Sequence, residues 1–368
     1  MASYFARRLL LMIPTFIGVT VIVFGITRLV PGGPVEKELM AIQSALAGGE
    51  GGAGTTMVGT ELITDKLRKQ LEQSFYLDKP FYEAYLLWLG DVVRLDLGES
   101  FATKEPVWTR IKERFPISLT FGLTGFILSY LICIPLGIAK ALRHAGVFDL
   151  ATSIVVFVGY SIPGWAIGLL LLVFLAGDKY WDVFPLGGTH SDTFASLPGL
   201  AQLIEDPDVV VDANGELVRE KMSLAARFLD RTYYMILPIF CYMMGSFATL
   251  TILTKNSLLD NLSQDYVRTA FAKGLAPMRV IFLHTLRNSL IPLATGLGHA
   301  LSVLMAGSLL IEQIFNIPGI GLLGYNALVG FDFTVVMGVL AINTVLLMFG
   351  NVFSDMLYAL IDPRIRFE

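Results

Sequence analysis

The chain has 368 residues, of which 54% are hydrophobic and only 16% are charged. Because soluble domains carry about 25% charged residues, this composition excludes an ordinary soluble domain and predicts a membrane protein. The net charge of −4 without a long basic run excludes a nucleic-acid binder, and two cysteines in apolar runs, Cys133 and Cys241, exclude a disulfide framework or zinc cluster.

Six stretches are long and apolar enough to cross a membrane, for which an α-helix needs about 20 residues. The first follows Arg7 and Arg8 and precedes Arg28 and Pro31, without a small-residue cleavage site, so we expect a retained helix. The predicted fold is all-α: a polytopic membrane protein with six transmembrane helices and extended outward-facing loops. The predicted spans are Leu9–Thr27, Ile117–Ala139, Leu150–Ala176, Tyr234–Thr254, Ser289–Ile311 and Val335–Val352.

Basic residues indicate which connections face the cytoplasm, because short cytoplasmic loops are enriched in Lys and Arg. The two long connections, 31–116 and 177–233, carry more acidic than basic groups, and 312–334 has neither Lys nor Arg. Both termini are therefore predicted to be cytoplasmic. The basic residues on the predicted cytoplasmic side are Arg7, Arg8, Lys140, Arg143, Lys255, Arg268, Lys273, Arg279, Arg287, Arg364 and Arg366.

These features divide the chain into three predicted parts. Residues 1–30 hold the first transmembrane helix, and 31–116 form an extracytoplasmic segment with amphipathic helices. Residues 117–368 form a core of five transmembrane helices, which includes the extracytoplasmic loop 177–233 and the cytoplasmic loop 255–288.

Pro80–Leu95, in the first outer segment, has the spacing of an amphipathic helix. We expect it to pack at the membrane surface or on the helix bundle, with contact to a docking partner as the alternative. Its predicted apolar face consists of Tyr82, Tyr85, Leu86 and Leu89, with Trp88 beside them.

The longest predicted cytoplasmic loop contains two helices joined by a glycine. Asn261–Lys273 has helical periodicity, and Asn261 with Gln264 is typical of a helix-start box. Gly274 ends this pattern, and Pro277 can begin a second helix that leads into the fifth span. The loop would present a helix, a turn and a helix to a cytosolic partner.

Asp265 to Leu275, with the sequence DYVRTAFAKGL, and the later LRNSLIP resemble the cytoplasmic EAA loop of ABC importer permeases. This version of the loop is similar to the one found in the dipeptide/oligopeptide (DppB/OppB) branch of those permeases. Where the general pattern has Glu-Ala-Ala before its glycine, this chain has Arg268, Thr269 and Ala270 before Gly274, so only Ala270 and Gly274 match it.

Further short motifs, in the same order along the chain, are similar to those permeases. The long outer insertions look most like the YejB-type subgroup. The motifs are RRLL at Arg7, VPGGP at Val30, LDKP at Leu77, DLGES at Asp96, IPGIG at Ile317 and DPR at Asp362.

The resemblance implies a permease subunit of an ATP-driven importer of peptides in the bacterial inner membrane. No lysine follows a glycine, so the chain lacks a phosphate-binding loop, and we expect no enzyme activity, no metal and no bound cofactor. ATP and Mg would be used by partner ABC ATPase subunits. A second permease, forming a heterodimer, and a periplasmic peptide-binding protein are the other implied partners.

The resemblance also implies which residues couple the chain to the ATPases. Arg268 would pair with an ATPase carboxylate, and Gly274 would permit a sharp turn. The alternative is an ordinary basic cytoplasmic loop. The implied coupling residues are Tyr266, Arg268, Thr269, Ala270, Lys273 and Gly274.

Small or polar residues within the spans are candidates for lining a translocation path. Such residues in membrane helices also serve close helix packing, which is the alternative for each. The candidates are Tyr160, Ser161, Gly164, His299, Ser302 and Asn343.

Two other functional classes were weighed against the permease. An ion-coupled secondary transporter would need carboxylates in its spans, and Asp355 is the acidic residue closest to one. A membrane enzyme would need a nucleophile with its base or a metal cluster, and the four histidines lack metal-ligand spacing.

Overall fold

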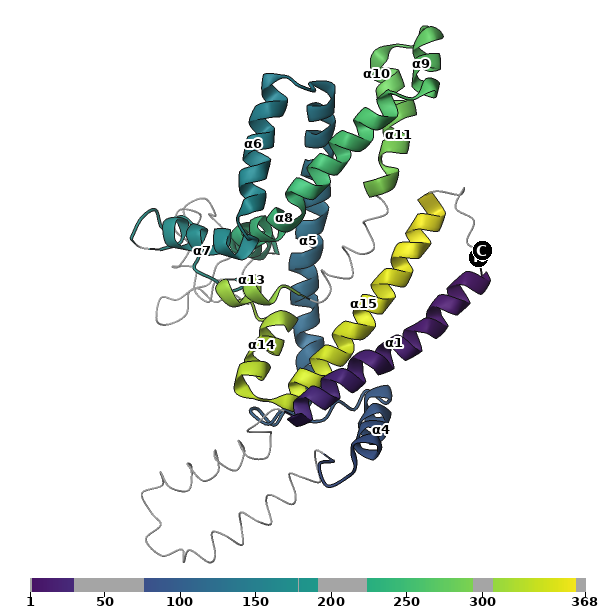
Figure 1. Ribbon diagram of the computed structural model, residues 1–368. Coiled ribbons are helices and arrows are strands. Elements are labelled where there is room, and N and C mark those ends of the chain that lie inside the picture. The colour runs from purple at the N-terminus through teal and green to yellow at the C-terminus, as the bar shows by residue number, and fades with distance from the viewer. Residues whose placement is uncertain (1, 30–75, 178, 191–223, 294–306, 362–368) are drawn as a thin grey trace, which may run out of the picture. The chain divides into compact units, whose positions relative to one another are not determined.

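The computed structural model describes residues 2–29, 76–177, 179–190, 224–293 and 307–361, which form helices and their connections (Figure 1). The chain divides into two compact units. The first unit holds Phe115–Leu322 and Leu347–Glu368, and the second holds Ala2–Arg114 and Leu323–Leu346.

Three helices form the frame of the first unit. α5 (Val107–Leu142) and α6 (Val147–Ser161) are joined by a short turn and lie antiparallel, and α8 (Leu224–Leu262) contacts α6 (Figure 1). α5 and α8 approach each other so closely at Gly137 that a Cβ there would lie 2.5 Å from Cβ of Thr254. The apolar core between these helices and the α13 segment consists of Phe121, Ala176, Met235, Leu237, Ile239, Cys241, Met243, Ile311, Phe315 and Ile317.

The third predicted span is not one continuous helix. α6 and α7 (Gly164–Leu175) are bent by 95° at Ile162 and Pro163. Proline lacks the N–H that a helix requires and disfavours helical backbone in the residue before it, and Ile162 is extended at φ −105° and ψ 123°. A Cβ at Gly164 would lie 2.6 Å from the carbonyl oxygen of Cys241, so glycine allows α7 to pack against α8.

Several helices extend beyond the predicted spans or lie outside them. α5 and α8 each begin ten residues before the predicted start, because hydropathy does not detect polar turns that continue a helix. The connection 312–334 contains helical segments that were not predicted. The remaining elements of the first unit are α9 (Asp265–Ala272), α10 (Pro277–Arg279), the π-helix η3 (Val280–Thr285), α11 (Leu286–Ser289) and α13 (Leu309–Ile314).

The second unit contains α1 (Ala2–Leu29) and α4 (Phe81–Val93), which pack through aromatic side chains. Phe24 of α1 lies edge-on to Tyr85, with ring centroids 5.7 Å apart, and Tyr85 shares a 2.8 Å hydrogen bond with Thr20. Of the predicted apolar face of α4, Tyr85 is buried and Leu89 packs beside it, whereas Tyr82 and Leu86 are 68% and 62% exposed. The buried residues of the helix are Ala84, Tyr85 and Val92, because α1 covers only one side of it.

The DLGES motif forms a buried network with the start of α15 (Phe333–Ile361). Ser100 Oγ donates to Asp332 Oδ2 at 2.5 Å and accepts from Arg110 Nη1 at 2.8 Å. Gly98 has φ +75°, and a Cβ there would lie 2.9 Å from Cγ2 of Thr334. α14 (Ile320–Gly330) precedes this junction in the chain.

In the described part of the chain, four helices are long and apolar enough to cross a membrane, and the bent α6–α7 pair would make a fifth. The four are parts of α1, α5, α8 and α15, and they overlap the predicted first, second, fourth and sixth spans. Most of the predicted fifth span, 294–306, lies outside the described residues.

Candidate functional site

The cytoplasmic loop of the sequence analysis is a folded pair of short helices. Two of its predicted boundaries were wrong: α8 continues to Leu262, and α9 begins at Asp265 without a side-chain cap. Asn261 is therefore in α8, where its Oδ1 accepts a 2.9 Å hydrogen bond from the Tyr266 hydroxyl. Pro277 begins the second helix as predicted.

Gly274 makes the turn between these helices. Its φ is +76°, a conformation that side chains with a Cβ disfavour, although no neighbouring atom would obstruct a Cβ. Its N–H donates to Phe271 O at 2.9 Å, and Leu275 N–H donates to Ala270 O at 3.4 Å. These bonds satisfy carbonyl groups at the end of α9, as is typical of glycine-capped helices.

The inner face of the loop is a small apolar core. Val267, Ala270 and Val280 are buried together, with Leu262 and Leu275 packed against them. Ala270 is only 8% exposed, so it packs between the two helices. This core makes the loop one folded element.

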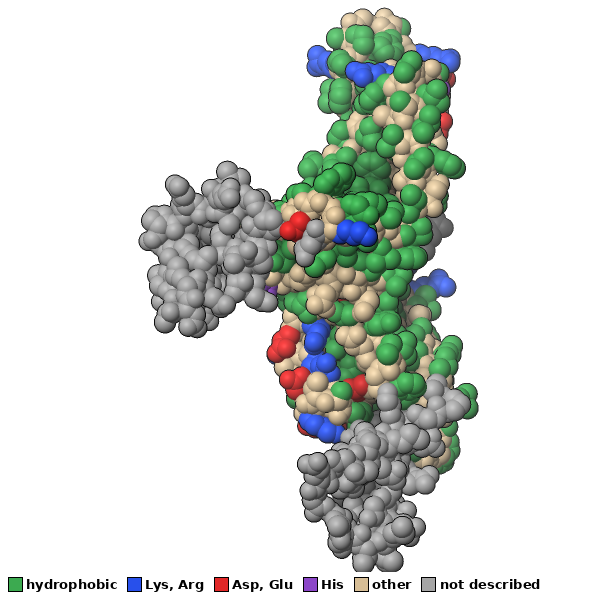
Figure 2. Space-filling model, turned by 90° about the vertical axis from the view of Figure 1, so that its left-hand side faces the viewer, with side chains coloured by type: hydrophobic (Ala, Val, Ile, Leu, Met, Phe, Trp, Pro, Cys, Tyr) green, Lys and Arg blue, Asp and Glu red, His purple; other side chains and the backbone are tan. Residues whose placement is uncertain are grey.

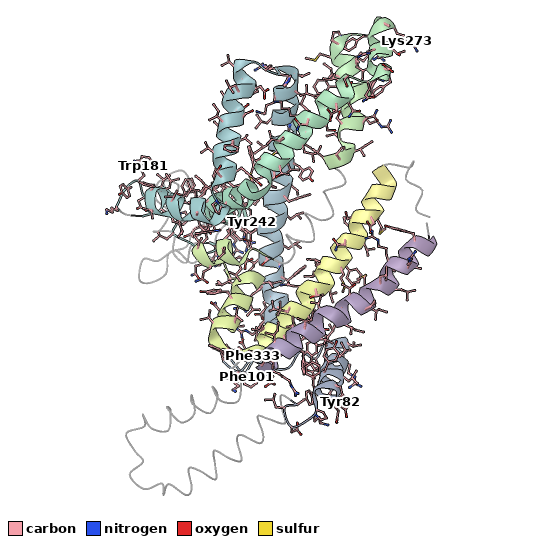
Figure 3. The ribbon with its side chains drawn as sticks, in the orientation of Figure 1. Tyr82, Phe101, Trp181, Tyr242, Lys273 and Phe333 are labelled. Atoms are coloured by element: carbon pink, nitrogen blue, oxygen red, sulfur yellow. The ribbon has the colours of Figure 1, made fainter. Side chains whose placement is uncertain are left out.

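The outer face of the loop combines basic and apolar side chains. Arg268, Thr269 and Lys273 are exposed, and Lys273 lies at the tip of the unit (Figure 3). Figure 2 shows Lys and Arg side chains among hydrophobic ones at this end. The Arg268 guanidinium lies 3.6 Å from Asp265 Oδ1 with both groups largely exposed, so little energy holds it there. Exposed apolar side chains of the loop are Tyr266, Phe271, Met278, Phe282 and Leu283.

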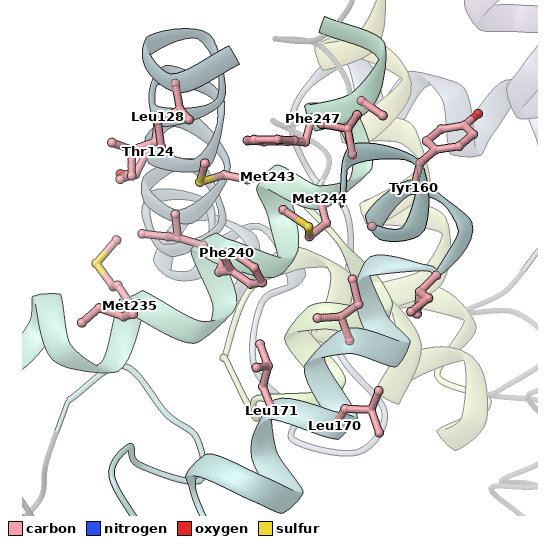
Figure 4. A pocket seen from close by; sticks show the side chains of 18 of the residues that line it. Thr124, Leu128, Tyr160, Leu170, Leu171, Met235, Phe240, Met243, Met244 and Phe247 are labelled. Carbon is pink, nitrogen blue, oxygen red and sulfur yellow. The ribbon is translucent and has the colours of Figure 1, made fainter. Parts of the chain in front are cut away.

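The larger cavity of the first unit has a volume of about 1230 Å³ and lies between α5, α6, α7 and α8 (Figure 4). Its wall is mainly apolar, with Met243, Met244 and Phe247 on α8 and Leu170 on α7. Tyr160, a predicted path residue, contributes to this wall.

A smaller cavity of about 800 Å³ is more polar. Residues with hydroxyl groups line it from two helices: Ser129 and Tyr130 on α5, and Tyr242, Ser246 and Thr249 on α8. The Ser246 hydroxyl donates to that of Ser129 at 3.4 Å. These residues were missed in the sequence analysis, although hydroxyl side chains in two apolar spans were a signal.

The structure separates the predicted path residues. Gly164 lines the smaller cavity. Ser161 lines neither of the two cavities, and its hydroxyl donates to Phe157 O at 2.9 Å. Asn343 lies in the second unit. His299 and Ser302 are outside the described residues.

Glu312 is a second feature that the sequence analysis missed, and it explains the IPGIG motif. The side chain has no exposed surface, and its carboxylate accepts hydrogen bonds from Ser118 Oγ and Leu322 N, both at 2.8 Å. A Cβ at Gly319 would overlap this carboxylate, so the motif wraps around a buried acid. Among the described residues, no group of His, Cys, Asp and Glu could hold a metal ion.

Comparisons of the sequence with a family model and with known proteins all give inner membrane components or permeases of transport systems. The family model "Binding-protein-dependent transport system inner membrane component" matches residues 133–367. The inner membrane ABC transporter permease protein YejB of Escherichia coli O157:H7 is 36% identical over 100% of both chains. The peptidoglycan transport system permease protein YejB of Agrobacterium fabrum is 35% identical over 100% of this chain and 99% of its own length.

Two further matches extend the comparison. The di/tripeptide transport system permease protein DppB of Pseudomonas aeruginosa is 33% identical over 100% of both chains. A solved structure of the inward-facing MetNI methionine ABC transporter has a TM-score of 0.48 and 15% identity, covering 68% of this chain and 96% of that chain.

Proposed function

This chain belongs to the family of binding-protein-dependent transport system inner membrane components, and we propose that it is the permease subunit of an ATP-driven importer of peptides. Curated relatives at 33% to 36% identity over the full chain are named as ABC, peptidoglycan and di/tripeptide permeases. The comparisons provide no support for the ion-coupled alternative.

The observation that carries the proposal is the surface of the α9–α10 loop. Exposed Phe271, Met278 and Phe282 lie on a folded element that also presents Arg268 and Lys273. Apolar anchors surrounded by charged groups are typical of a protein interface. We propose that separate ABC ATPase subunits bind this surface and supply the energy of ATP hydrolysis.

Within this surface, the predicted coupling residues have different roles. Tyr266, Arg268 and Lys273 would contact the ATPase, because they are exposed. Ala270 would act indirectly, because its buried side chain packs α9 against Val280. Gly274 would set the angle between α9 and α10. Thr269 is exposed, but its hydroxyl donates to Asp265 O at 2.9 Å, so we assign it a role within α9.

We propose that the smaller cavity is this chain's contribution to the translocation path. Hydroxyl groups both donate and accept hydrogen bonds, so those of Ser246 and Thr249 in its wall can serve the alternating N–H and C=O groups of a peptide. The wall of the larger cavity is more apolar, although four hydroxyl side chains line it as well. A path of this kind would be completed by a second permease, and a soluble binding protein would deliver the peptide from outside.

The positive-inside pattern supports an orientation in the bacterial inner membrane with both termini in the cytoplasm. In that orientation, the α9–α10 loop faces the compartment that contains ATP. The C-terminal ends of α5 and α8 would then be the cytoplasmic ends of their spans.

Gly274→Val tests the coupling assignment. A β-branched residue is strongly disfavoured at φ +76°, so α9 should tilt while the membrane helices stay folded. We expect peptide uptake by the reconstituted complex to fall about tenfold or more, the effect of roughly 1.4 kcal/mol of lost coupling, while the chain remains inserted.

Gly274→Asn is the matched control, because Asn tolerates this backbone conformation better than Val. It should retain most of the uptake. Normal uptake by a stably inserted Gly274→Val complex would refute the coupling role of the turn. If no ATPase subunit co-purifies with the tagged wild-type chain, the importer itself is refuted.

A further inference from the structure

A buried ionic cluster lies where α5 ends and α6 begins. The Asp149 carboxylate accepts hydrogen bonds from Lys255 Nζ of α8 at 2.7 Å and 2.8 Å, and its Oδ1 lies 3.2 Å from Lys140 Nζ of α5. The side chains of Lys140 and Asp149 are 1% and 6% exposed. We call Lys140, Asp149 and Lys255 the Asp149 cluster.

The two lysines of this cluster have different anchors. Lys140 Nζ also donates to Asp149 O, Thr152 Oγ1 and Ser153 Oγ at 2.8 Å to 3.0 Å, so α5 and α6 stay joined without the carboxylate. For Lys255, the structure gives hydrogen bonds to the Asp149 carboxylate only. The carboxylate therefore adds an ionic connection from the α5–α6 hairpin to α8, beside the apolar packing of Leu258 on α5.

This connection lies beyond one end of the larger cavity. Side chains of α6 and α8, such as Val155 and Met244, face that cavity along the middle of the helices. At the far end of α6, glycine lets the chain contact α8, since a Cβ at Gly164 would meet Cys241. The Asp149–Lys255 pair thus joins α6 and α8 at their cytoplasmic ends. Along their middle, both helices line the larger cavity.

The part of α8 that carries Lys255 is tied to the α9–α10 loop. Ser257 Oγ donates to Ser289 O at 2.8 Å, which joins the two ends of the loop at its base. Leu258 has no exposed surface and packs with Ile138, Ala141 and Leu286. A displacement of the loop would therefore carry Lys255 with it.

Stability alone does not account for a buried ionic cluster. Burial removes the water around each charge, and replacement of such pairs by apolar side chains often leaves a protein equally stable. A hydrogen-bonded ion pair does, however, hold two helices in one register more specifically than apolar contacts, which can slide.

We propose that Asp149 is a positioning residue that transmits movement of the α9–α10 loop and α8 to the α5–α6 hairpin. This inference rests on the proposed function, because it requires that ATPase subunits move the loop. α6 lines the larger cavity and α5 lines both cavities, so the hairpin would carry the loop's displacement to the walls of the transport unit.

Lys255→Met in the reconstituted complex tests the link. The change keeps the length and apolar stem of the side chain, removes the bond to Asp149 and leaves Lys140 as its counter-ion. We expect ATP hydrolysis to stay near the wild-type rate while peptide uptake per ATP falls about fivefold or more, the lower end of typical coupling effects.

Spin labels measure the link directly. Val147 of α6 is 86% exposed and Ser263 of the loop is exposed, while both natural cysteines are buried, so labelled cysteines can replace these two residues. In the wild-type background, the distance between the labels should stay the same with and without ATP. In Lys255→Met, it should change with ATP, because the ion pair no longer holds α6 to α8 and α6 follows the loop less closely.

Two controls separate the link from general stability. Thr152→Val removes one acceptor of Lys140 and leaves the Lys255 pair, so coupling should be normal. Lys255→Arg can restore a charged two-point contact with the carboxylate and should recover uptake. Normal uptake per ATP in Lys255→Met would overturn the proposal, and so would failure of Lys255→Met to assemble while Thr152→Val assembles.

The outcomes also distinguish this proposal from the proposed function. If ATPases co-purify and Gly274→Val uncouples uptake but Lys255→Met does not, only the Asp149 link is wrong. If neither variant changes uptake per ATP, the coupling role of the loop is wrong as well.

Discussion

Two buried acids of the first unit have different kinds of partner. Asp149 has lysine partners on α5 and α8. Glu312 is held by a hydroxyl and a backbone N–H, and glycines leave room for it: a Cβ at Gly307 would lie 2.7 Å from Glu312 Oε1. The IPGIG motif is thus explained by the space and the donors that one carboxylate requires.

Glu312→Ala should destabilise the protein strongly. Ser118 Oγ and Leu322 N would lose their acceptor, and two unsatisfied buried donors together cost roughly 2–6 kcal/mol of the free energy of unfolding. Thermal unfolding of the purified protein, followed by tryptophan fluorescence, measures the loss. Glu312→Gln, which keeps the shape and one acceptor, should lose less; an Ala variant that melts with the wild type would contradict the assigned role of Glu312.

At the scale of elements, the α9–α10 loop is a folded surface on the end of α8. The apolar core beneath it lets exposed side chains change without loss of the fold. Phe282 is 50% exposed on η3, where its side chain is open to a partner. Aromatic anchors of this kind contribute much of the binding energy of protein interfaces.

Phe282→Ser should weaken binding of the ATPase subunits about tenfold, as expected for a residue that contributes roughly 1–2 kcal/mol to an interface. The amount of ATPase that co-purifies with the tagged permease at increasing dilution measures this effect. Phe157→Ser, at a 68% exposed aromatic on α6, is the matched control and should bind ATPase normally. Equal ATPase retention by both variants would remove Phe282 from the interface.

At the scale of the whole molecule, the two cavities found among the described residues of the first unit differ in chemistry. The smaller one has hydroxyl side chains of α5 and α8 in its wall, whereas apolar side chains make up most of the wall of the larger one. A polar substrate loses water when it enters a membrane protein, and hydrogen-bonding walls offset that cost. The smaller cavity is therefore the one suited to peptides.

Ser246→Leu should reduce peptide uptake about tenfold by filling the smaller cavity and removing a hydroxyl group, a loss of roughly 1.4 kcal/mol. ATP hydrolysis should continue, because the α9–α10 loop is unchanged. Uptake of labelled peptide into proteoliposomes, with hydrolysis measured in parallel, gives both values. Met244→Leu, on the wall of the larger cavity, is the control; equal uptake by both variants would place the path elsewhere.

Local patterns were sufficient to predict the loop and its breaks. Gly274 marks the turn because glycine tolerates a positive φ, and Pro277 marks the start of the second helix because proline fixes φ near its helical value. The same kind of pattern failed at Asn261, which resembles a helix cap but lies within α8. Tertiary packing of Leu258 and Leu262 extends that helix past the capping signal.

The amino-acid sequence by itself determined the membrane class, the apolar segments and the helix–turn–helix form of the α9–α10 loop, because hydropathy and helical periodicity depend on neighbouring residues. Only the tertiary structure decided the partners of the polar groups. Glu312 meets Ser118 across 194 positions, and Lys255 meets Asp149 across 106. No local pattern encodes such pairs. They form only when packing buries these polar side chains away from water, so that each becomes the other's partner.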